Sequence, residues 1–137
     1  MIKFTVYGEP RGKGRPHFNR KNGIAYTPAS TRQAERDFLS QAIQYKPKEP
    51  LNGALSIELT FYLAIPASKP KKWREGALNG SILPAKKPDI DNLIKSVLDP
   101  MNSIFFQDDK QIIWLTAAKL YSVTPRTKVE IEEAVTI

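Results

Sequence analysis

The sequence predicts a single α+β domain, a mixed β-sheet with helices packed on it in the order β-α-β-α-β-β. Its 137 residues are about the length of one domain and are enough to bury a core. Stretches in which apolar residues alternate with period two are interspersed with stretches of helical spacing. The chain contains neither an internal repeat nor a low-complexity tract. We therefore expect one domain over residues 1–137.

The first half of the chain predicts a strand, a long loop, a helix and a second strand. Residues 2–7 alternate with period two and predict a half-buried strand. Residues 8–28 are rich in Gly, Pro, Arg and Lys, which predicts a basic, flexible loop. Residues 27–45 open with Thr-Pro and carry apolar residues three or four apart, as an amphipathic helix does. Residues 55–65 predict a strand with its apolar side chains on one face.

The second half predicts one more helix and two closing strands. Residues 66–88 are rich in Pro and Lys, with one helical turn around Trp73. A helix begins near residue 89 or 91 and runs to about residue 101, and Pro100 removes an intrahelical bond and kinks its last turn. The stretches 111–121 and 128–135 predict the two final strands.

The composition excludes several classes of protein. A content of 41% apolar residues is too high for a disordered chain. The absence of Cys excludes a disulfide scaffold, a thiolate metal site and cysteine catalysis, and the single His17 excludes a histidine triad or a multi-histidine zinc site within one chain. No apolar run approaches the roughly 20 residues of a membrane helix, and residues 1–9 do not resemble a signal peptide. We therefore expect a cytoplasmic protein with no membrane partner.

The charge is strongly basic and unevenly distributed. Lys and Arg number 21 against 14 Asp and Glu, a net charge of +7. Residues 1–36 and 66–88 are basic, whereas residues 89–109 hold five Asp against one Lys. A basic surface suits a phosphate polymer, and carboxylates grouped within it would repel that polymer unless a cation lay between them. A solvated basic surface with acidic caps and turns is the alternative explanation.

The acidic window contains a set of residues suited to metal chemistry. The stretch KPDIDNLIK places Asp89 and Asp91 where a loop meets a helix, and Lys95 follows four residues after Asp91 on the same face. Asp108 and Asp109 come just before the next strand. Oxygen ligands without nearby His or Cys select Mg²⁺ or Mn²⁺, which assists phosphodiester hydrolysis, and Lys95 would stabilise charge on the phosphate. Taken singly, these residues also suit a helix cap, a turn and a surface ion pair.

The order and spacing of these residues resemble a known family. The pattern Lys87-Pro88-Asp89-x-Asp91-Asn92-Leu93-x-Lys95, then Asp99, then Asp108-Asp109-x-Gln111, resembles the signature of the RusA-type Holliday junction resolvases. The segments Gly8-x-Pro10, Lys13-Gly14-Arg15-Pro16 and Tyr26-Thr27-Pro28 resemble the version found in phages and prophages of Gram-positive bacteria.

The resemblance implies a RusA-like fold and a Mg²⁺-dependent homodimeric endonuclease that nicks four-way junction DNA symmetrically inside the bacterial host cell. It further implies that Asp89, Asp91 and Asp109 bind the metal and that Lys95 is the catalytic lysine. Asp108 and Gln111 would lie next to the metal ligands without binding the metal themselves. Pro100 departs from the family pattern, which usually has Ala there, and this puts the placement of residues 101–106 in doubt.

Basic and aromatic residues outside the acidic window are candidates for DNA contact. We expect phosphate contacts from the loop 8–28 and from the lysines of residues 66–88, namely Arg11, Lys13, Arg15, Arg20, Lys71, Lys72, Lys86 and Lys87. A P-loop is excluded because residues 8–14 have the wrong spacing and end in Gly where Ser or Thr is needed. The aromatic residues Trp73, Phe105, Phe106 and Trp114 would stack on bases or pack, and packing in the core or a dimer interface is the commoner role.

Two other functions are consistent with the same residues. In the first, the protein is a DNA-binding module whose acidic residues are helix caps and turns, and it needs no divalent ion. In the second, it is a metal-dependent nuclease that acts on other branched or duplex DNA. The second has the same active-site residues, so only a comparison of substrates distinguishes it.

Overall fold

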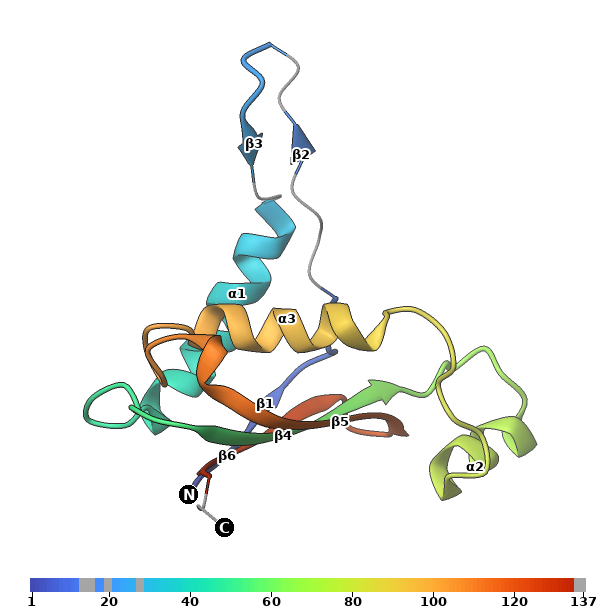
Figure 1. Cartoon of the computed structure of the whole chain (residues 1–137). Coiled ribbons are helices and arrows are strands. Elements are labelled where there is room, and N and C mark those ends of the chain that lie inside the picture. Colours follow the sequence, from blue (N-terminus) through green and yellow to red (C-terminus); the bar gives the residue numbers. More distant parts are fainter. Residues whose placement is uncertain (13–16, 19–20, 27–28, 135–137) are drawn as a thin grey trace.

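A four-stranded mixed sheet with helices on one face confirms the predicted fold class (Figure 1). The computed structural model describes residues 1–12, 17–18, 21–26 and 29–134. The sheet has the strand order β1-β6-β4-β5. Its strands are β1 (Ile2–Tyr7), β4 (Leu55–Ala64), β5 (Ile112–Ser122) and β6 (Arg126–Glu133). The strand over residues 2–7 lies where the alternation predicts it.

The pairing of the strands leaves β5 at one edge of the sheet. β6 pairs antiparallel with both β1 and β4, whereas β4 and β5 run parallel. In this parallel pair Leu55 lies beside Ile112 and Phe61 beside Lys119, with a bulge after Leu55. Because no described strand pairs with the outer side of β5, its backbone groups there are available to a further strand.

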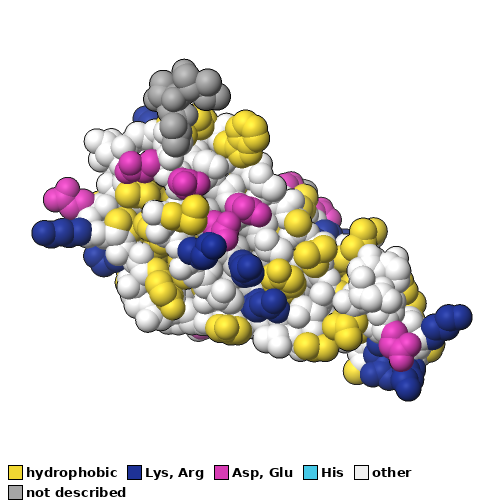
Figure 2. All heavy atoms as spheres, turned by 90° about the horizontal axis from the view of Figure 1, so that it is seen from below, with side chains coloured by type: hydrophobic (Ala, Val, Ile, Leu, Met, Phe, Trp, Pro, Cys, Tyr) yellow, Lys and Arg dark blue, Asp and Glu magenta, His cyan; other side chains and the backbone are white. Residues whose placement is uncertain are grey.

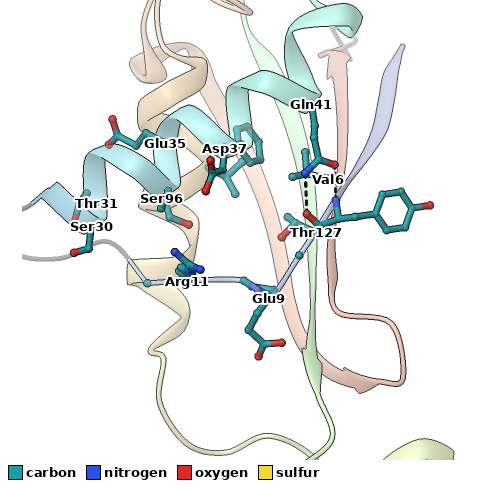
Figure 3. A pocket seen from close by; sticks show the side chains of 17 residues that line it. Val6, Glu9, Arg11, Ser30, Thr31, Glu35, Asp37, Gln41, Ser96 and Thr127 are labelled. Atoms are coloured by element: carbon teal, nitrogen blue, oxygen red, sulfur yellow. Dashed lines mark hydrogen bonds between the residues drawn. The ribbon is translucent and has the colours of Figure 1, made fainter.

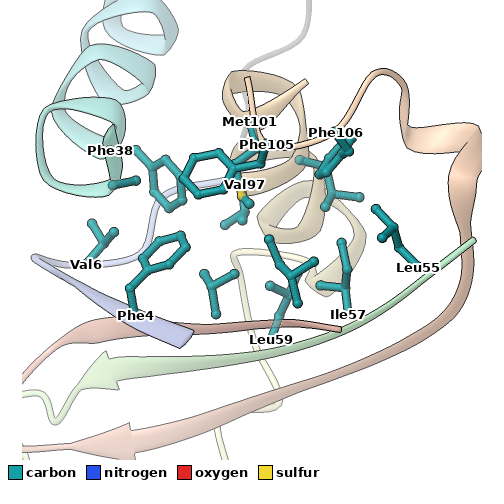
Figure 4. Packing of buried hydrophobic residues seen from close by; sticks show 14 of the residues in the cluster. Phe4, Val6, Phe38, Leu55, Ile57, Leu59, Val97, Met101, Phe105 and Phe106 are labelled. Atoms are coloured by element: carbon teal, nitrogen blue, oxygen red, sulfur yellow. The ribbon is translucent and has the colours of Figure 1, made fainter. Parts of the chain in front are cut away.

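The core lies between the sheet and two helices, α1 (Ala29–Ala42) and α3 (Ile90–Met101) (Figures 1 and 4). Alternate side chains of β4 point toward the helices, as the period-two pattern predicts. Aromatic residues fill the space below the helices, and Phe4 stacks on Phe105 with ring centroids 5.5 Å apart. The core side chains include Phe4, Phe38, Leu55, Ile57, Leu59, Phe61, Leu93, Val97, Met101, Phe105 and Phe106.

Helix α3 ends at Met101, one residue after Pro100. The missing N–H of Pro100 therefore falls in the last turn, where an interrupted hydrogen bond disturbs the fewest residues. The chain then turns through Ser103, whose φ is 70°, and returns Phe105 and Phe106 to the core. Pro100 thus does not prevent residues 101–106 from packing.

A second helix, α2 (Lys71–Asn79), replaces the single helical turn predicted around Trp73. It ends at Gly80, whose φ of 87° is the left-handed conformation that commonly terminates a helix. The Trp73 ring packs edge-on against Tyr121, with centroids 5.6 Å apart, in a small cluster separate from the main core. Figure 1 shows α2 beyond one end of the sheet.

The predicted loop 8–28 contains a two-stranded ribbon of β2 (His17–Phe18) and β3 (Ala25–Tyr26). The loop begins beside the start of α3. A Cβ added to Gly12 would lie 3.2 Å from the Pro88 Cβ and 3.3 Å from the Asn92 Cβ, so the absence of a side chain permits this approach.

Gln41 of α1 holds the end of β1, since its amide accepts from the Tyr7 N–H and donates to the Tyr7 carbonyl, both at 2.8 Å (Figure 3).

The face of the sheet away from the helices is polar over β1, β4 and β6. Lys3 forms an ion pair with Glu130 at 3.1 Å, and this hydrogen bond holds the pKa of Glu130 below its usual value. The Arg126 guanidinium lies 3.9 Å from the centre of the Tyr62 ring.

Figure 2 shows Lys and Arg side chains gathered at the end of the molecule formed by α2. Among the described residues no helix is long and apolar enough to cross a membrane.

Candidate active site

Two carboxylates lie at the start of α3, and neither side chain forms a capping hydrogen bond with the helix. Asp89 is the N-cap residue with an extended backbone, and its carbonyl accepts from the Leu93 N–H at 3.1 Å. The Asp89 side chain makes no capping hydrogen bond, and Asp91 lies exposed in the first turn. The helix end favours negative charge, since its free N–H groups carry partial positive charge. Capping by these side chains, the structural alternative for this part of the motif, is therefore not present.

Lys95 lies one turn after Asp91 and is also exposed. Within the described part of the chain, its ammonium is not within the 4.0 Å of an ion pair with the Asp91 carboxylate. Asp91 and Lys95 therefore do not form the surface ion pair that would have explained their spacing without a functional role. Both remain available to a ligand outside the chain.

Asp89 and Asp91 border an open hollow of about 640 Å³. The backbone between α2 and α3 forms one wall, with Leu83 and Pro84, and β5 contributes Lys119. Lys86 and Lys87 also line this space, so two carboxylates and three lysines surround it. Such a mixed lining suits a bound cation together with a phosphate, because the cation neutralises the carboxylates and the phosphate neutralises the lysines.

Lys119 belongs to none of the patterns that the sequence alone displays. Its Nζ donates to the carbonyl of Lys86 at 2.7 Å and to that of Pro88 at 3.0 Å, although these residues lie more than thirty positions earlier. The detectable signal was a lysine on the helix-facing side of an otherwise apolar strand, beside Phe61 of β4. A half-buried lysine on this side of the sheet favours hydrogen-bond partners, so its position indicates a specific contact.

The second acidic pair lies in a short 3₁₀ helix, η2 (Asp109–Gln111), before β5. Asp108 caps it, since its carboxylate accepts from the Lys110 N–H at 3.0 Å. Gln111 completes the cap by accepting from the Asp108 N–H, and its amide donates to the carbonyls of Leu51 and Gly53, each at 2.9 Å. Asp108 is thus occupied by the fold, while Asp109 is exposed beside it. This geometry is consistent with the supporting roles expected for Asp108 and Gln111.

Within one chain, Asp109 lies far from Asp89 and Asp91. It precedes Ile112 at the start of β5, whereas Lys119, which contacts the loop before Asp89, lies seven residues further along that strand. At about 3.3 Å per residue, these two points on β5 are about 23 Å apart. Figure 1 shows α3 and β5 beginning at opposite ends of the sheet. Accordingly, no group of three metal-ligating side chains occurs among the described residues.

Loss of the Gln111 amide should weaken the fold without touching the hollow. We expect Gln111→Ala to lower the free energy of unfolding by about 1–3 kcal/mol, because it leaves the Asp108 N–H and the part-buried Leu51 carbonyl without their partner. Urea denaturation measures this change. Gln44→Ala is the control, since Gln44 is exposed and donates only to the nearby Gln41 carbonyl. Equal stability of the two variants would contradict the role of Gln111.

The predicted DNA-contacting residues fall into separate regions. Arg11 is exposed and lines a second hollow of about 270 Å³, which lies between the segment after β1 and the helices α1 and α3 (Figure 3). Lys71 and Lys72 are exposed on α2, at the end of the molecule that also carries the first hollow. Lys13, Arg15 and Arg20 lie outside the described residues.

The aromatic residues differ in their outcomes. Phe105 and Phe106 are fully buried and Trp73 packs on Tyr121, so packing is confirmed for these three. Trp114 is 68% exposed in the described chain, so it does not pack in the core of one copy, and its packing in a dimer interface stays a prediction. The bulge after Leu55 and the edge position of β5 explain this, because no element of the described chain covers that end of the strand.

The donor set of the hollow fits Mg²⁺. This ion prefers oxygen ligands and commonly binds through one or two carboxylates together with substrate phosphates. Asp89 and Asp91 supply two such carboxylates, and neither is engaged in a hydrogen bond of the helix cap. The lysines of the hollow are placed to attract the phosphate that would complete the coordination.

The chain resembles known proteins over most of its length. The family described as endodeoxyribonuclease RusA matches residues 7–132. The chain is 38% identical over 136 residues to the uncharacterized protein YqaN of Bacillus subtilis, and the match covers 96% of both chains. It is 34% identical over 97 residues to the crossover junction endodeoxyribonuclease rusA of Lactococcus phage r1t, covering 69% of this chain and 67% of the phage protein. The matched region contains both acidic pairs, the hollow, strands β4 and β5, and β6 up to Glu132, and the chain belongs to the RusA family of endodeoxyribonucleases.

Proposed function

We propose that this protein is a Mg²⁺-dependent or Mn²⁺-dependent endonuclease that resolves Holliday junctions by paired symmetric nicks. The observation that carries the proposal is the pair of uncapped carboxylates, Asp89 and Asp91, facing lysines across one hollow in a RusA-family chain. The name of the phage relative, a crossover junction endodeoxyribonuclease, supports the choice of substrate. A phage- or prophage-encoded enzyme of this kind would act on DNA in the cytoplasm of the bacterial host.

Each residue of the site has a chemical role in this proposal. Asp89 and Asp91 hold the divalent ion at the start of α3. The bound ion would polarise the scissile phosphate and lower the pKa of the attacking water. Lys95 donates to the phosphate oxygens on which negative charge builds during the reaction. These roles require side chains without partners in the fold, which is how Asp91 and Lys95 are found among the described residues.

Asp109 joins this site when it comes from a second copy of the chain. The edge strand β5 exposes Ile113, Trp114 and Leu115 at 67%, 68% and 40%. An unpaired edge with exposed large apolar side chains is suited to pairing with another strand. A two-fold axis near Trp114 would pair two copies of β5 in antiparallel fashion. The homodimer implied by the family resemblance would thus extend the sheet across both copies.

The direction of this pairing determines which residues meet. Asp109 lies five residues before Trp114 and Lys119 five residues after it, so an antiparallel pair centred on Trp114 would bring Asp109, in η2 just before β5, toward Lys119 of the other copy. Since Lys119 borders the hollow of Asp89 and Asp91, each hollow would gain a third carboxylate. Two complete sites related by a two-fold axis match the two opposed nicks that resolution of a junction requires.

Basic side chains around the hollow would hold the DNA. Lys86 and Lys87 line the hollow beside the carboxylates, Lys71 and Lys72 are exposed on α2, and all four would contact phosphates. Arg11, together with Lys13, Arg15 and Arg20, would add contacts from the loop 8–28. Phosphate contacts of this kind release counterions, so junction binding should weaken steeply as the salt concentration rises.

Cleavage assays on defined DNA substrates test the function. The purified protein is incubated with a synthetic four-way junction, a flap and a matched linear duplex, each with Mg²⁺ and with EDTA. We expect symmetric nicks in the junction only, and none in EDTA. Binding without cleavage in Mg²⁺ and in Mn²⁺ would instead identify a DNA-binding module. Cleavage of the flap or the duplex at the same rate as the junction would identify a nuclease of broader substrate range.

A further inference from the structure

We infer that Lys119 is a positioning residue that ties the segment before Asp89 to the sheet and thereby sets the separation of Asp89 and Asp91. This inference rests on the proposed function, because it concerns the metal-binding pair of the same hollow. It assigns a role to a residue that the spacing of the acidic motif does not include.

The position of Lys119 in the sheet is unusual for a lysine. It lies on the helix-facing side of β5, beside the fully buried Phe61 of β4. Its neighbours on the same side of β5 are Ala117 and Tyr121, which are partly or fully buried among apolar residues. The Lys119 side chain is half-buried there, and the N–H groups of an ammonium at such a place favour hydrogen-bond acceptors. The acceptors are two backbone carbonyls of the segment that leads into α3.

These two hydrogen bonds connect the loop to a rigid element. The carbonyls of Lys86 and Pro88 lie on either side of Lys87, and Asp89 follows directly. The Lys119 ammonium is therefore hydrogen-bonded to the residues immediately before the Asp89 carboxylate. The other backbone hydrogen bond within this segment joins the Ala85 N–H to the Leu83 carbonyl and does not reach the sheet. Asp91 is held independently because it belongs to α3, which packs on the core. Lys119 therefore couples the position of Asp89 to the body of the protein.

Charge and geometry predict opposite effects of removing this lysine on metal binding. An ammonium that borders the hollow repels a divalent cation, so by charge alone its removal would strengthen metal binding. If its hydrogen bonds position Asp89, removal instead weakens metal binding because the two carboxylates are no longer held at a fixed separation. The sign of the change distinguishes a positioning role from a purely electrostatic one.

The test is Lys119→Met, which retains the long side chain and removes the N–H donors. Binding of Mn²⁺ is measured by the loss of the free-ion signal in electron paramagnetic resonance, with the junction present at a temperature where cleavage is slow. We expect Mn²⁺ binding at least about tenfold weaker than in the parent, the range typical of residues that orient metal ligands. Junction nicking should recover as the Mg²⁺ concentration is raised. Lys128→Met, on the opposite face of the sheet, removes the same charge and should bind Mn²⁺ like the parent.

Several results would overturn this inference. Mn²⁺ binding by Lys119→Met that equals or exceeds that of the parent would exclude a positioning role, whatever the change in melting temperature. If Lys119→Met does not fold, Lys119→Leu supplies the same comparison with a shorter side chain that also lacks N–H donors, and the same weakening is expected. A parent that binds Mn²⁺ without nicking junctions would refute the proposed function and leave the Lys119 comparison valid. A parent that binds no Mn²⁺ would refute both.

Discussion

Asp91→Asn is expected to lower junction cleavage by on the order of a thousandfold while junction binding stays the same or becomes tighter. The substitution removes one of two carboxylates that hold the divalent ion, and the charge stabilisation that such an ion supplies is worth several kcal/mol, with each ~1.4 kcal/mol a factor of ten in rate. Asn has nearly the same shape, and Asp91 is exposed and forms no ion pair with Lys95, so the fold should not change. The loss of a negative charge near DNA favours binding.

Separate assays of cleavage and of binding distinguish the two expected effects of Asp91→Asn. Nicking rates are taken on a labelled four-way junction in Mg²⁺, and binding is measured by gel shift in Ca²⁺, where cleavage is suppressed. Glu49→Gln is the matched control, because Glu49 is an exposed carboxylate in the turn before β4, outside the residues that line the hollow. It should nick at the parental rate. Parental nicking by Asp91→Asn would refute the assignment of this residue to the metal.

Mixed dimers of Asp91→Asn and Asp109→Asn should regain nicking that neither variant has alone. In the proposed dimer each hollow takes Asp91 from one copy and Asp109 from the other. A mixed dimer therefore contains one hollow with both substitutions and one with both native carboxylates. Random mixing in equal amounts yields half mixed dimers, so roughly a quarter of the parental nicking should return, as single nicks without the paired second cut.

Co-expression of the two variants with different tags allows purification of the mixed dimers. If Asp109 acted within its own chain, both hollows of a mixed dimer would be damaged and nicking would stay absent, which would reject the shared site. Trp114→Glu tests the interface itself, because a charge on each copy at the two-fold axis opposes the pairing of β5. It should be monomeric by light scattering, and it should not nick junctions, whereas the outer-face variant Lys128→Met should remain dimeric.

The local elements of the fold follow from the sequence because their causes are local. Alternation over residues 2–7 predicts β1 with the bounds that the structure has, and the apolar face of residues 55–65 predicts β4 to within one residue. The start of α3 follows from Pro88. A proline disfavours the helical conformation in the residue before it, here Lys87, whereas a helix can begin after it. The acidic motif is likewise visible in the sequence, and its resemblance to the RusA family depends on residue types and their order rather than on tertiary contacts.

The length of α2 was the main local error. A single turn was predicted around Trp73, in a segment whose Pro and Lys content resembles a loop, whereas the helix spans nine residues. Its stability comes from contacts that the local pattern does not contain, because Trp73 and Ala77 pack against Leu63 and Tyr121 of distant strands. Tertiary packing of one apolar face commonly overrides weak local propensity in this way.

The sequence by itself determined the fold class, the family and the identity of Asp89, Asp91, Lys95 and Asp109 as candidates. Only the tertiary structure decided which of them meet. Parallel pairing of β4 with β5 sets the start of β5 at the end of the sheet away from the start of α3, which separates Asp109 from Asp89 and brings Lys119 to the loop instead. The physical reason is that such distances depend on strand direction and order, and these arise from the packing of the whole chain rather than from the residues beside each carboxylate.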